Sequence, residues 1–247
     1  MSLPRFYCPN ILASGAVVSL PVNAAQHASR ALRLQEGDGV ILFNGDGNDY
    51  TAKLVSIRKN EVTAGIKSVS KNTTESPIKV TLAQAISSGD RMDYTIQKAV
   101  EMGVAAIQPI ASQRSVVKLN GERAEKRREH WQNVVISACE QSGRAIVPEV
   151  SASASLANWL GLIAATGNAF HTRITLSPTA EQTLADLLKP EGDICLLVGA
   201  EGGLSEEEIA LAATHGFTPV RLGNRILRTE TAGLAALAAM QALWGDF

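Results

Sequence analysis

A buried strand that ends abruptly in a glycine-rich turn constrains this chain more than any other feature. The apolar run ICLLV at residues 194–198 is typical of a strand covered on both faces of a parallel sheet. GAEGG at residues 199–203 follows at once, and Ser205 and Glu208 then have the spacing of a helix capping box. Strand, tight turn and helix in immediate succession indicate an α/β fold.

The same pattern occurs again a short way along the chain. A short strand is predicted at residues 217–222, and it ends in Leu222-Gly223 before another helix begins near residue 231. In an open α/β sheet, ligands bind at the edge formed by the carboxyl ends of the strands. The sequence therefore predicts a ligand site that uses both turns, although turn geometry alone would explain the glycines of either one.

Neither turn matches a common nucleotide-binding motif. The Gly-Lys-Ser/Thr sequence of a P-loop is missing after residues 199–203, and the glycine spacing differs from GxGxxG. Glycines at these positions let backbone N–H groups approach a ligand closely, and the following helix N-terminus attracts negative charge.

Three arginines and one glutamate stand close to the second turn and before the last predicted helix. Guanidinium groups beside a ligand-binding edge could hold a phosphate or an RNA backbone. They could equally pair with the acidic helix start at residues 206–208, and spacing alone does not separate the two interpretations. The residues concerned are Arg221, Arg225, Arg228 and Glu230.

Composition excludes several other classes of protein. No apolar run approaches the roughly 20 residues of a membrane-spanning helix, and the N-terminus lacks a signal-peptide core, so a cytoplasmic location is expected. Cys8, Cys139 and Cys195 lie far apart, which predicts free thiols, and neither they nor the histidines predict a metal site. The net charge is −1, so nucleic-acid contacts must come from local basic patches.

The 247 residues divide into two regions with different patterns. Short alternating strands dominate up to about residue 70 and predict a small β-barrel, with one short helix at residues 27–33. The polar segment 70–77 has the composition of a linker. Strands then alternate with helices, which predicts a mostly parallel sheet. We therefore expect domains at residues 1–72 and 77–247.

Several motifs together resemble the RsmE family of SPOUT-class RNA methyltransferases. The two glycine turns carry the resemblance first, and it extends over the whole chain. The matching segments are VGAEGGLS at 198–205, LGNRILRTETA at 222–232, QKAVEMGV at 97–104, ACEQSGR at 138–144, and His27, Arg30, Leu32 and Arg33.

The resemblance implies an α/β SPOUT domain with a parallel sheet and a trefoil knot, preceded by a PUA-like β-barrel. It also implies a homodimer, S-adenosylmethionine as the methyl donor, no metal, and methylation of N3 of a uridine in 16S ribosomal RNA within the small ribosomal subunit. Two alternatives remain. One is a SPOUT methyltransferase for another RNA or for a ribose 2′-hydroxyl, and the other is a non-catalytic RNA-binding assembly factor.

On the basis of this resemblance, we assign residues to roles as hypotheses. Arg228 would stabilise a developing uracil anion, Arg144 would help to orient the RNA, and Glu230 is a weaker candidate for the general base. RNA contacts are expected from Arg30, Arg33, Arg114 and Arg144. Cofactor contacts are expected from His171, Leu197, Gly199, Glu201, Gly202, Gly203, Leu222, Gly223, Arg225, Leu227 and Thr231.

The chain departs from the family pattern at two positions. The family commonly has proline where this sequence has Ala200, and often where it has Thr172. Both changes should loosen a turn slightly without removing a functional side chain.

Overall fold

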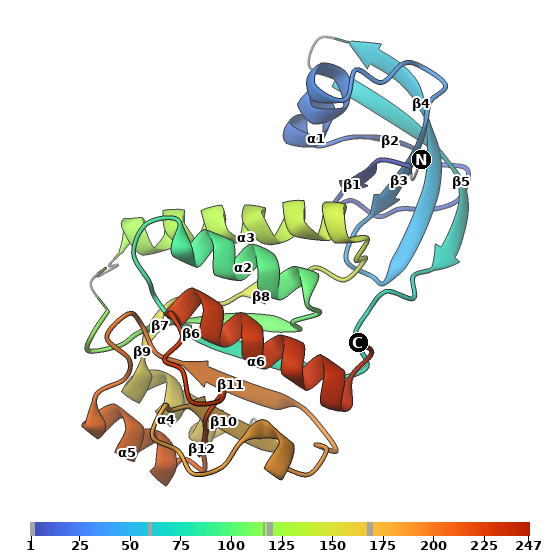
Figure 1. Cartoon of the computed structure of the whole chain (residues 1–247). Helices are drawn as coiled ribbons and strands as arrows, with labels where there is room; N and C mark the ends of the chain where they lie inside the picture. The colour runs from blue at the N-terminus through green and yellow to red at the C-terminus, as the bar shows by residue number, and fades with distance from the viewer. Residues whose placement is uncertain (1–2, 59–60, 116, 118–120, 167–169) are drawn as a thin grey trace. The chain divides into compact units, whose positions relative to one another are not determined.

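A computed structural model describes residues 3–58, 61–115, 117, 121–166 and 170–247 of the chain (Figure 1). Contacts divide the chain into two compact units. The first comprises Met1–Glu75 with Ile136–Val147, and the second comprises Ser76–Val135 with Pro148–Phe247. Residues 136–147 thus belong to the first unit although they follow part of the second unit in the sequence. The predicted division into two consecutive domains does not include this return.

The first unit is built on a five-stranded mixed sheet. Its strands lie in the order β1-β3-β4-β5-β2, with β1 parallel to β3 and the other neighbours antiparallel. The thiol of Cys8, just after β1, lies 3.8 Å from the carbonyl of Ser19 at the end of β2, so the two edge strands approach each other without a strand pairing among the described residues. The strands are β1 Arg5–Tyr7, β2 Val17–Ser19, β3 Gly39–Phe43, β4 Asn48–Arg58 and β5 Glu61–Lys71.

One helical segment covers the core of this unit. The sequence predicts a helix at residues 27–33, whereas the structure has α1 at Val22–Gln26 continued by a π-helical turn at His27–Ala31. Small buried side chains at Ala24, Ala25 and Ala28 let this segment approach the sheet closely. The earlier start reflects tertiary burial of these alanines, which short-range spacing does not reveal.

The second unit contains a sheet whose described strands all pair in parallel, where the sequence predicts a mostly parallel one. Its order is β12-β10-β11-β6-β7-β8, with β9 also paired to β7. All five residues of β11 are buried, which explains the continuous apolar run at residues 194–198. The strands are β6 Val80–Ala85, β7 Ala106–Ala111, β8 Glu149–Val150, β9 Ala154–Ser155, β10 Thr172–Leu176, β11 Ile194–Val198 and β12 Thr218–Val220.

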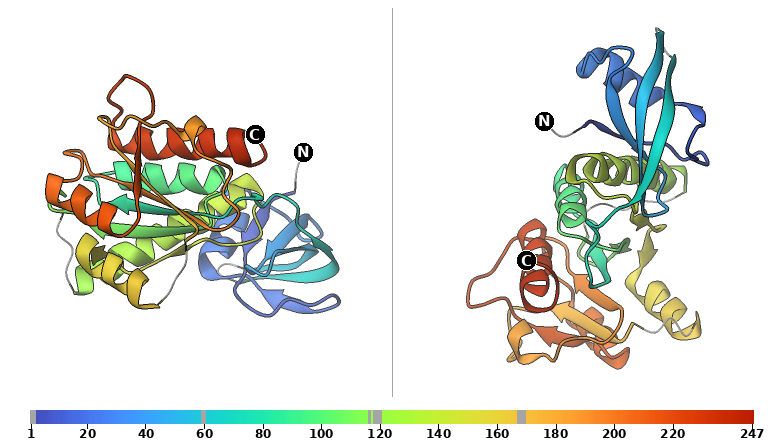
Figure 2. Two further views of the ribbon diagram at one scale, coloured as in Figure 1. Left: turned by 90° about the horizontal axis from the view of Figure 1, so that it is seen from below. Right: turned by 90° about the vertical axis from the view of Figure 1, so that its right-hand side faces the viewer.

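Helices cover both faces of this sheet. Figures 1 and 2 show α2 and α6 on one face and α4 and α5 on the other. None of the helices in the described part of the chain is long and apolar enough to cross a membrane. The helices are α2 Arg91–Glu101, α3 Glu122–Ser142, α4 Leu156–Thr166, α5 Glu206–Thr214 and α6 Thr229–Trp244.

Candidate functional site

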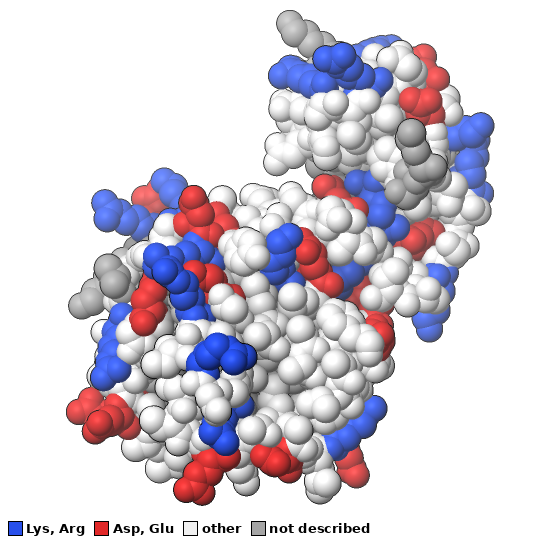
Figure 3. Space-filling view, viewed as in Figure 1, with Lys and Arg blue, Asp and Glu red and all other residues white. Residues whose placement is uncertain are grey.

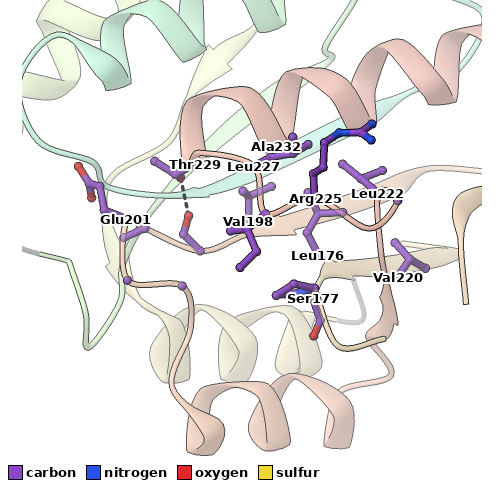
Figure 4. Close-up of a pocket in the computed structure, with 17 residues that line it drawn as sticks. Leu176, Ser177, Val198, Glu201, Val220, Leu222, Arg225, Leu227, Thr229 and Ala232 are labelled. Carbon is purple, nitrogen blue, oxygen red and sulfur yellow. Dashed lines mark hydrogen bonds between the residues drawn. The ribbon is translucent and has the colours of Figure 1, made fainter. Parts of the chain in front are cut away.

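A cavity of about 310 Å³ lies at the carboxyl edge of the parallel sheet (Figure 4). The segments that follow β10, β11 and β12 line it together with the first turn of α6. Its volume lies in the range of small-molecule sites, and its position is where an α/β sheet binds ligands. The lining residues are 176–178, 198–203, Val220, Leu222, Gly223, 225–227, Thr229 and Ala232.

The turn after β11 has no room for a side chain at its first position. A Cβ atom on Gly199 would lie 2.7 Å from the carbonyl carbon of Gly203. Gly203 has a φ of +69°, and its N–H donates to the Ala200 carbonyl at 2.8 Å. The predicted capping box is present, because Ser205 accepts from the N–H of Glu208 at the start of α5. The turn is therefore a compact cradle of backbone groups.

The second turn is tied to the first by one hydroxyl group. Gly223 has a φ of +74°, and the chain then runs past Ile226, whose side chain is 87% exposed, into α6. The hydroxyl of Thr229 donates to the Gly199 carbonyl at 2.6 Å, as the dashed line in Figure 4 shows. The two glycine turns thus form two walls of one cavity.

Glu201 fastens the first turn to the start of α2. One of its carboxylate oxygens accepts hydrogen bonds from the Ser88 N–H, the Ser88 hydroxyl and Arg91 Nη1, each at 2.9 Å. Partial burial raises the pKa of Glu201, but these hydrogen bonds lower it more, and the pKa falls to about 2. Although Glu201 lines the cavity, its carboxylate is directed toward Ser88 and Arg91 and stays ionised near neutral pH.

Most of the residues expected to contact a cofactor line this cavity. They are Gly199, Glu201, Gly202, Gly203, Leu222, Gly223, Arg225 and Leu227. Pro178, Ser177 and Leu176 also line it but were missed, although the rule that ligands bind at strand carboxyl ends could have found them. Thr229 and Ala232 lie within the matching segment 222–232 but were not assigned to the cofactor, and no local pattern marks Ser88 or Arg91.

Three of the expected cofactor residues lie elsewhere. His171 precedes β10, where its N–H donates to the Asp193 carbonyl, so it stands at the opposite end of the strand from the cavity. Leu197 is fully buried in the core beneath α4 and α5, because strand alternation turns it away from the lining residue Val198. Thr231 is exposed on α6, outside the residues that line the cavity.

The residues assigned to catalysis lie around the glycine turns, with one exception, and so does Arg114 of the residues assigned to RNA. Arg228 is exposed at the N-cap of α6, and no described residue pairs with its side chain. Glu230 is largely buried, 3.9 Å from Arg91 Nε, and Arg114 Nη1 donates to the Gly202 carbonyl at 2.7 Å. Among the described residues, no ion pair joins Arg221, Arg225 or Arg228 to the acidic start of α5.

Arg144 is the exception. It lies in the first unit, is 4% exposed, and donates from Nη2 to Glu75 at 2.6 Å and from Nε to the same oxygen at 3.1 Å. The guanidinium of Arg144 is therefore buried and bound to a carboxylate of the same unit, and its role in orienting RNA stays a prediction. Arg30 and Arg33 are exposed on the same unit, and no described residue pairs with either side chain.

Charge does not gather into one broad field on the face shown in Figure 3. Basic and acidic side chains alternate there, as the net charge of −1 leads one to expect. The described residues also include no group of three or more His, Cys, Asp or Glu side chains placed to hold a metal ion.

Two family models match this chain. The one described as an RNA methyltransferase domain covers residues 74–241, and the one described as an RNA methyltransferase PUA domain covers residues 20–67. The fold and the cavity therefore belong to an RNA methyltransferase that carries an N-terminal PUA domain.

Individual relatives identify the family within this class. Ribosomal RNA small subunit methyltransferase E of Buchnera aphidicola (from Schizaphis graminum) is 33% identical over 99% of this chain and 98% of its own length. The Bacillus subtilis protein of the same name is also 33% identical, over 90% of this chain and 88% of its own. The chain belongs to the ribosomal RNA small subunit methyltransferase E family, RsmE.

Solved structures support the same assignment. The RsmE protein of Neisseria gonorrhoeae, bound to S-adenosylmethionine, is 45% identical and covers both chains completely, with a TM-score of 0.92. A Legionella pneumophila methyltransferase, also with bound S-adenosylmethionine, is 39% identical over both full chains, with a TM-score of 0.94. The predicted combination of a PUA domain and a SPOUT-type α/β domain is confirmed.

Proposed function

We propose that this chain binds S-adenosylmethionine in the cavity and transfers its methyl group to N3 of a uridine in small-subunit ribosomal RNA. The observation that carries the proposal is the cavity itself, in which backbone groups of three strand-end segments converge in a chain of the RsmE family. The proposed location is the cytoplasm, and the three buried free cysteines suit a reducing compartment.

The residues present fit this cofactor. The walls combine apolar side chains, among them Leu176, Val220 and Leu222, with the exposed backbone of residues 199–203. A neutral adenine ring needs such a mixture, because backbone N–H and carbonyl groups can read its edge while apolar side chains cover its faces. A side chain at Gly199 would press on the backbone of the same turn, so the cradle requires glycine there.

The cofactor supplies a methyl group that is already activated. The protein must then position the uracil and help N3 to lose its proton, since a protonated N3 is a poor nucleophile. Arg228 can place a positive charge beside the developing uracil anion, because its side chain is exposed next to the cavity. Glu201, with a pKa of about 2, is too weak a base to accept the proton, and Glu230 stays the proposed carboxylate for this role.

The proposal includes the assembly that the resemblance implies, a trefoil knot in the second unit and a homodimer. Large apolar side chains stay exposed at the C-terminal end of the chain, where Leu243 is 47% and Phe247 68% exposed. Such residues can be covered by a second copy. Size-exclusion chromatography with light scattering tests the homodimer, and a monomer at micromolar concentration contradicts it.

The central experiment is methyl transfer from labelled S-adenosylmethionine to small ribosomal subunits from cells that lack this protein, followed by nucleoside analysis. Label in 3-methyluridine supports the proposal. Label in tRNA or in a ribose 2′-O-methyl group would instead support the alternative methyltransferases. Absence of both label and cofactor binding would support the RNA-binding assembly factor.

A further inference from the structure

A fully buried glutamine stands behind the two glycine turns. Gln84 lies near the end of β6, in the middle of the parallel sheet, and none of its surface is exposed. A buried amide is unfavourable unless its donors and acceptors are hydrogen-bonded, so its presence among apolar neighbours requires a reason.

The side-chain amide of Gln84 completes a chain of hydrogen bonds into the cavity wall. Its Nε2 donates to the Thr229 hydroxyl at 3.0 Å, and that hydroxyl donates its own hydrogen to the Gly199 carbonyl at 2.6 Å. Nε2 also donates to the Ala85 carbonyl at 3.1 Å, whereas its direct contact with the Gly199 carbonyl is long, at 3.5 Å, so the shorter route to Gly199 runs through Thr229. The Gly199 carbonyl can only accept, so the single hydrogen of the Thr229 hydroxyl goes to it. Any further hydrogen bond to the Thr229 oxygen must therefore come from a donor, and the side-chain amide at position 84 supplies that donor.

The oxygen of the same side-chain amide lacks a hydrogen bond. Oε1 of Gln84 has no hydrogen-bond partner in the described part of the chain, and a Cβ atom at Gly233 of α6 would lie 3.2 Å from it. The amide thus occupies space that the glycine leaves open, at the expense of an unpaired acceptor. Departures of this kind from a well-satisfied core concentrate at functional sites.

We propose that Gln84 is a positioning residue for the cofactor site, acting through Thr229. By holding the Thr229 hydroxyl toward Gly199, it sets how far the turn after β11 stands from the start of α6. Both Gly199 and Thr229 line the cavity, so a change in this distance alters the space for the cofactor. This inference rests on the proposed function, because it concerns the binding of S-adenosylmethionine.

The chain offers a matched control for the competing view that Gln84 is only a polar core residue. Gln108 of β7 is also buried, and its Nε2 likewise donates to the next carbonyl in its strand, that of Pro109, and to the loop carbonyl of Ala152. Gln108 is not among the residues that line the cavity, and the two hydrogen bonds of its amide go to residues outside that lining. Substitution of either glutamine by methionine removes the amide at similar side-chain volume.

The test compares Q84M and Q108M by calorimetric titration with S-adenosylmethionine and by thermal unfolding without it. We expect Q84M to weaken cofactor binding about tenfold and Q108M to leave it within twofold, with similar shifts in Tm. Equal affinities for the wild type and Q84M, or equal reductions in both variants, would overturn the inference alone. A wild-type protein that does not bind S-adenosylmethionine would overturn the proposed function and this inference with it.

A second measurement asks whether Gln84 acts through Thr229. If it does, the double variant Q84M/T229V binds the cofactor no more weakly than T229V alone, because the second substitution removes the group that Gln84 positions. Fully additive reductions in affinity would show that Gln84 affects the cavity by another route and would overturn the assignment. Normal cofactor affinity in T229V would overturn it as well.

Discussion

The glycine turns of the second unit and the motif ACEQSGR at the end of α3 both match the same family pattern, yet their polar groups face different surroundings. In the turns, Gly199 and Gly223 leave backbone groups open toward a cavity. At the end of α3, Arg144 is turned inward and its guanidinium is bound to Glu75. A strong motif therefore marks residues that matter without saying whether they face a ligand or a neighbour in the same chain.

The inward-facing region extends beyond one ion pair. Glu75 also accepts hydrogen bonds from the N–H groups of Ala145 and Ile146, and Arg5 pairs with Asp49 at 2.8 Å. Asn72 joins Asp49 to the Gly143 carbonyl. These contacts hold residues 136–147 in the first unit.

The largest effect is expected at Arg144, where a substitution should lower stability without changing cofactor binding. R144M leaves Glu75 without its partner and should lower the free energy of unfolding by about 3 kcal/mol, because an uncompensated charge stays largely buried. Cofactor affinity of the folded fraction should not change. R128M is the control, since Arg128 forms a similarly short but solvent-exposed pair with Glu125 on the same helix, and its loss should leave the free energy of unfolding nearly unchanged. Urea unfolding measures both, and a fully stable R144M would show that the ion pair contributes little.

Arg228 should show the reverse behaviour. R228A is expected to reduce turnover about 100-fold, through loss of charge stabilisation in the transition state, with no change in Tm because the side chain is exposed. Single-turnover methyl transfer under saturating cofactor measures the effect. R123A, which removes another exposed arginine at the start of α3, should leave turnover unchanged. Normal turnover in R228A would remove Arg228 from the proposed mechanism.

The glycine cradle can be broken with a single methyl group. G199A places a Cβ atom 2.7 Å from backbone of the same turn, so the turn must shift, and cofactor affinity should fall about tenfold, or ~1.4 kcal/mol. G161A is the control, because a Cβ atom at Gly161 in α4 meets no atom within 4 Å. Calorimetric titration measures both, and unchanged affinity in G199A would mean that the turn is not the cofactor cradle.

A pH-dependent contribution is expected from the Glu201 contacts. Its pKa is depressed from 4.5 to about 2 in the folded protein, so the stabilisation is complete above about pH 4.5 and is lost as the pH falls toward 2. Because solvent screens this partly exposed group, we expect E201Q to lose only about 1 kcal/mol at pH 7. Urea unfolding at pH 7 and pH 3 should show the difference from wild type shrinking at the lower pH. E191Q, an exposed loop substitution, should show no such trend.

The smallest effect contrasts the exposed arginines of the first unit with the buried Arg144. If Arg30 and Arg33 bind phosphates, the R30A/R33A variant should bind small-subunit RNA with a log–log salt slope shallower by about 0.7 for each phosphate that the variant no longer neutralises. K53A, on strand β4 of the same unit, is the control. Filter binding across a salt series measures the slopes, and an unchanged slope would exclude both arginines from the RNA interface.

Local sequence determined the features that depend on neighbouring residues. The apolar run of β11, the glycine turn after it and the capping box of Ser205 and Glu208 need only short-range periodicity and backbone geometry, and all three are present. The position of the ligand edge followed from the parallel sheet. The same reasoning could have added Ser177 and Pro178, had it been applied to the end of β10.

Only the tertiary structure decided which polar side chains face the cavity. Arg144 turns inward to pair with Glu75, and the sequence does not reveal this partner because it lies 69 residues earlier. His171 lies outside the cavity because it precedes β10, whereas the cavity lies at the other end of that strand. Gln84 and Thr229, 145 residues apart, meet only when β6 and α6 pack together. Burial and hydrogen-bond partners arise from residues distant in sequence, so a motif can locate a functional segment but cannot orient its side chains.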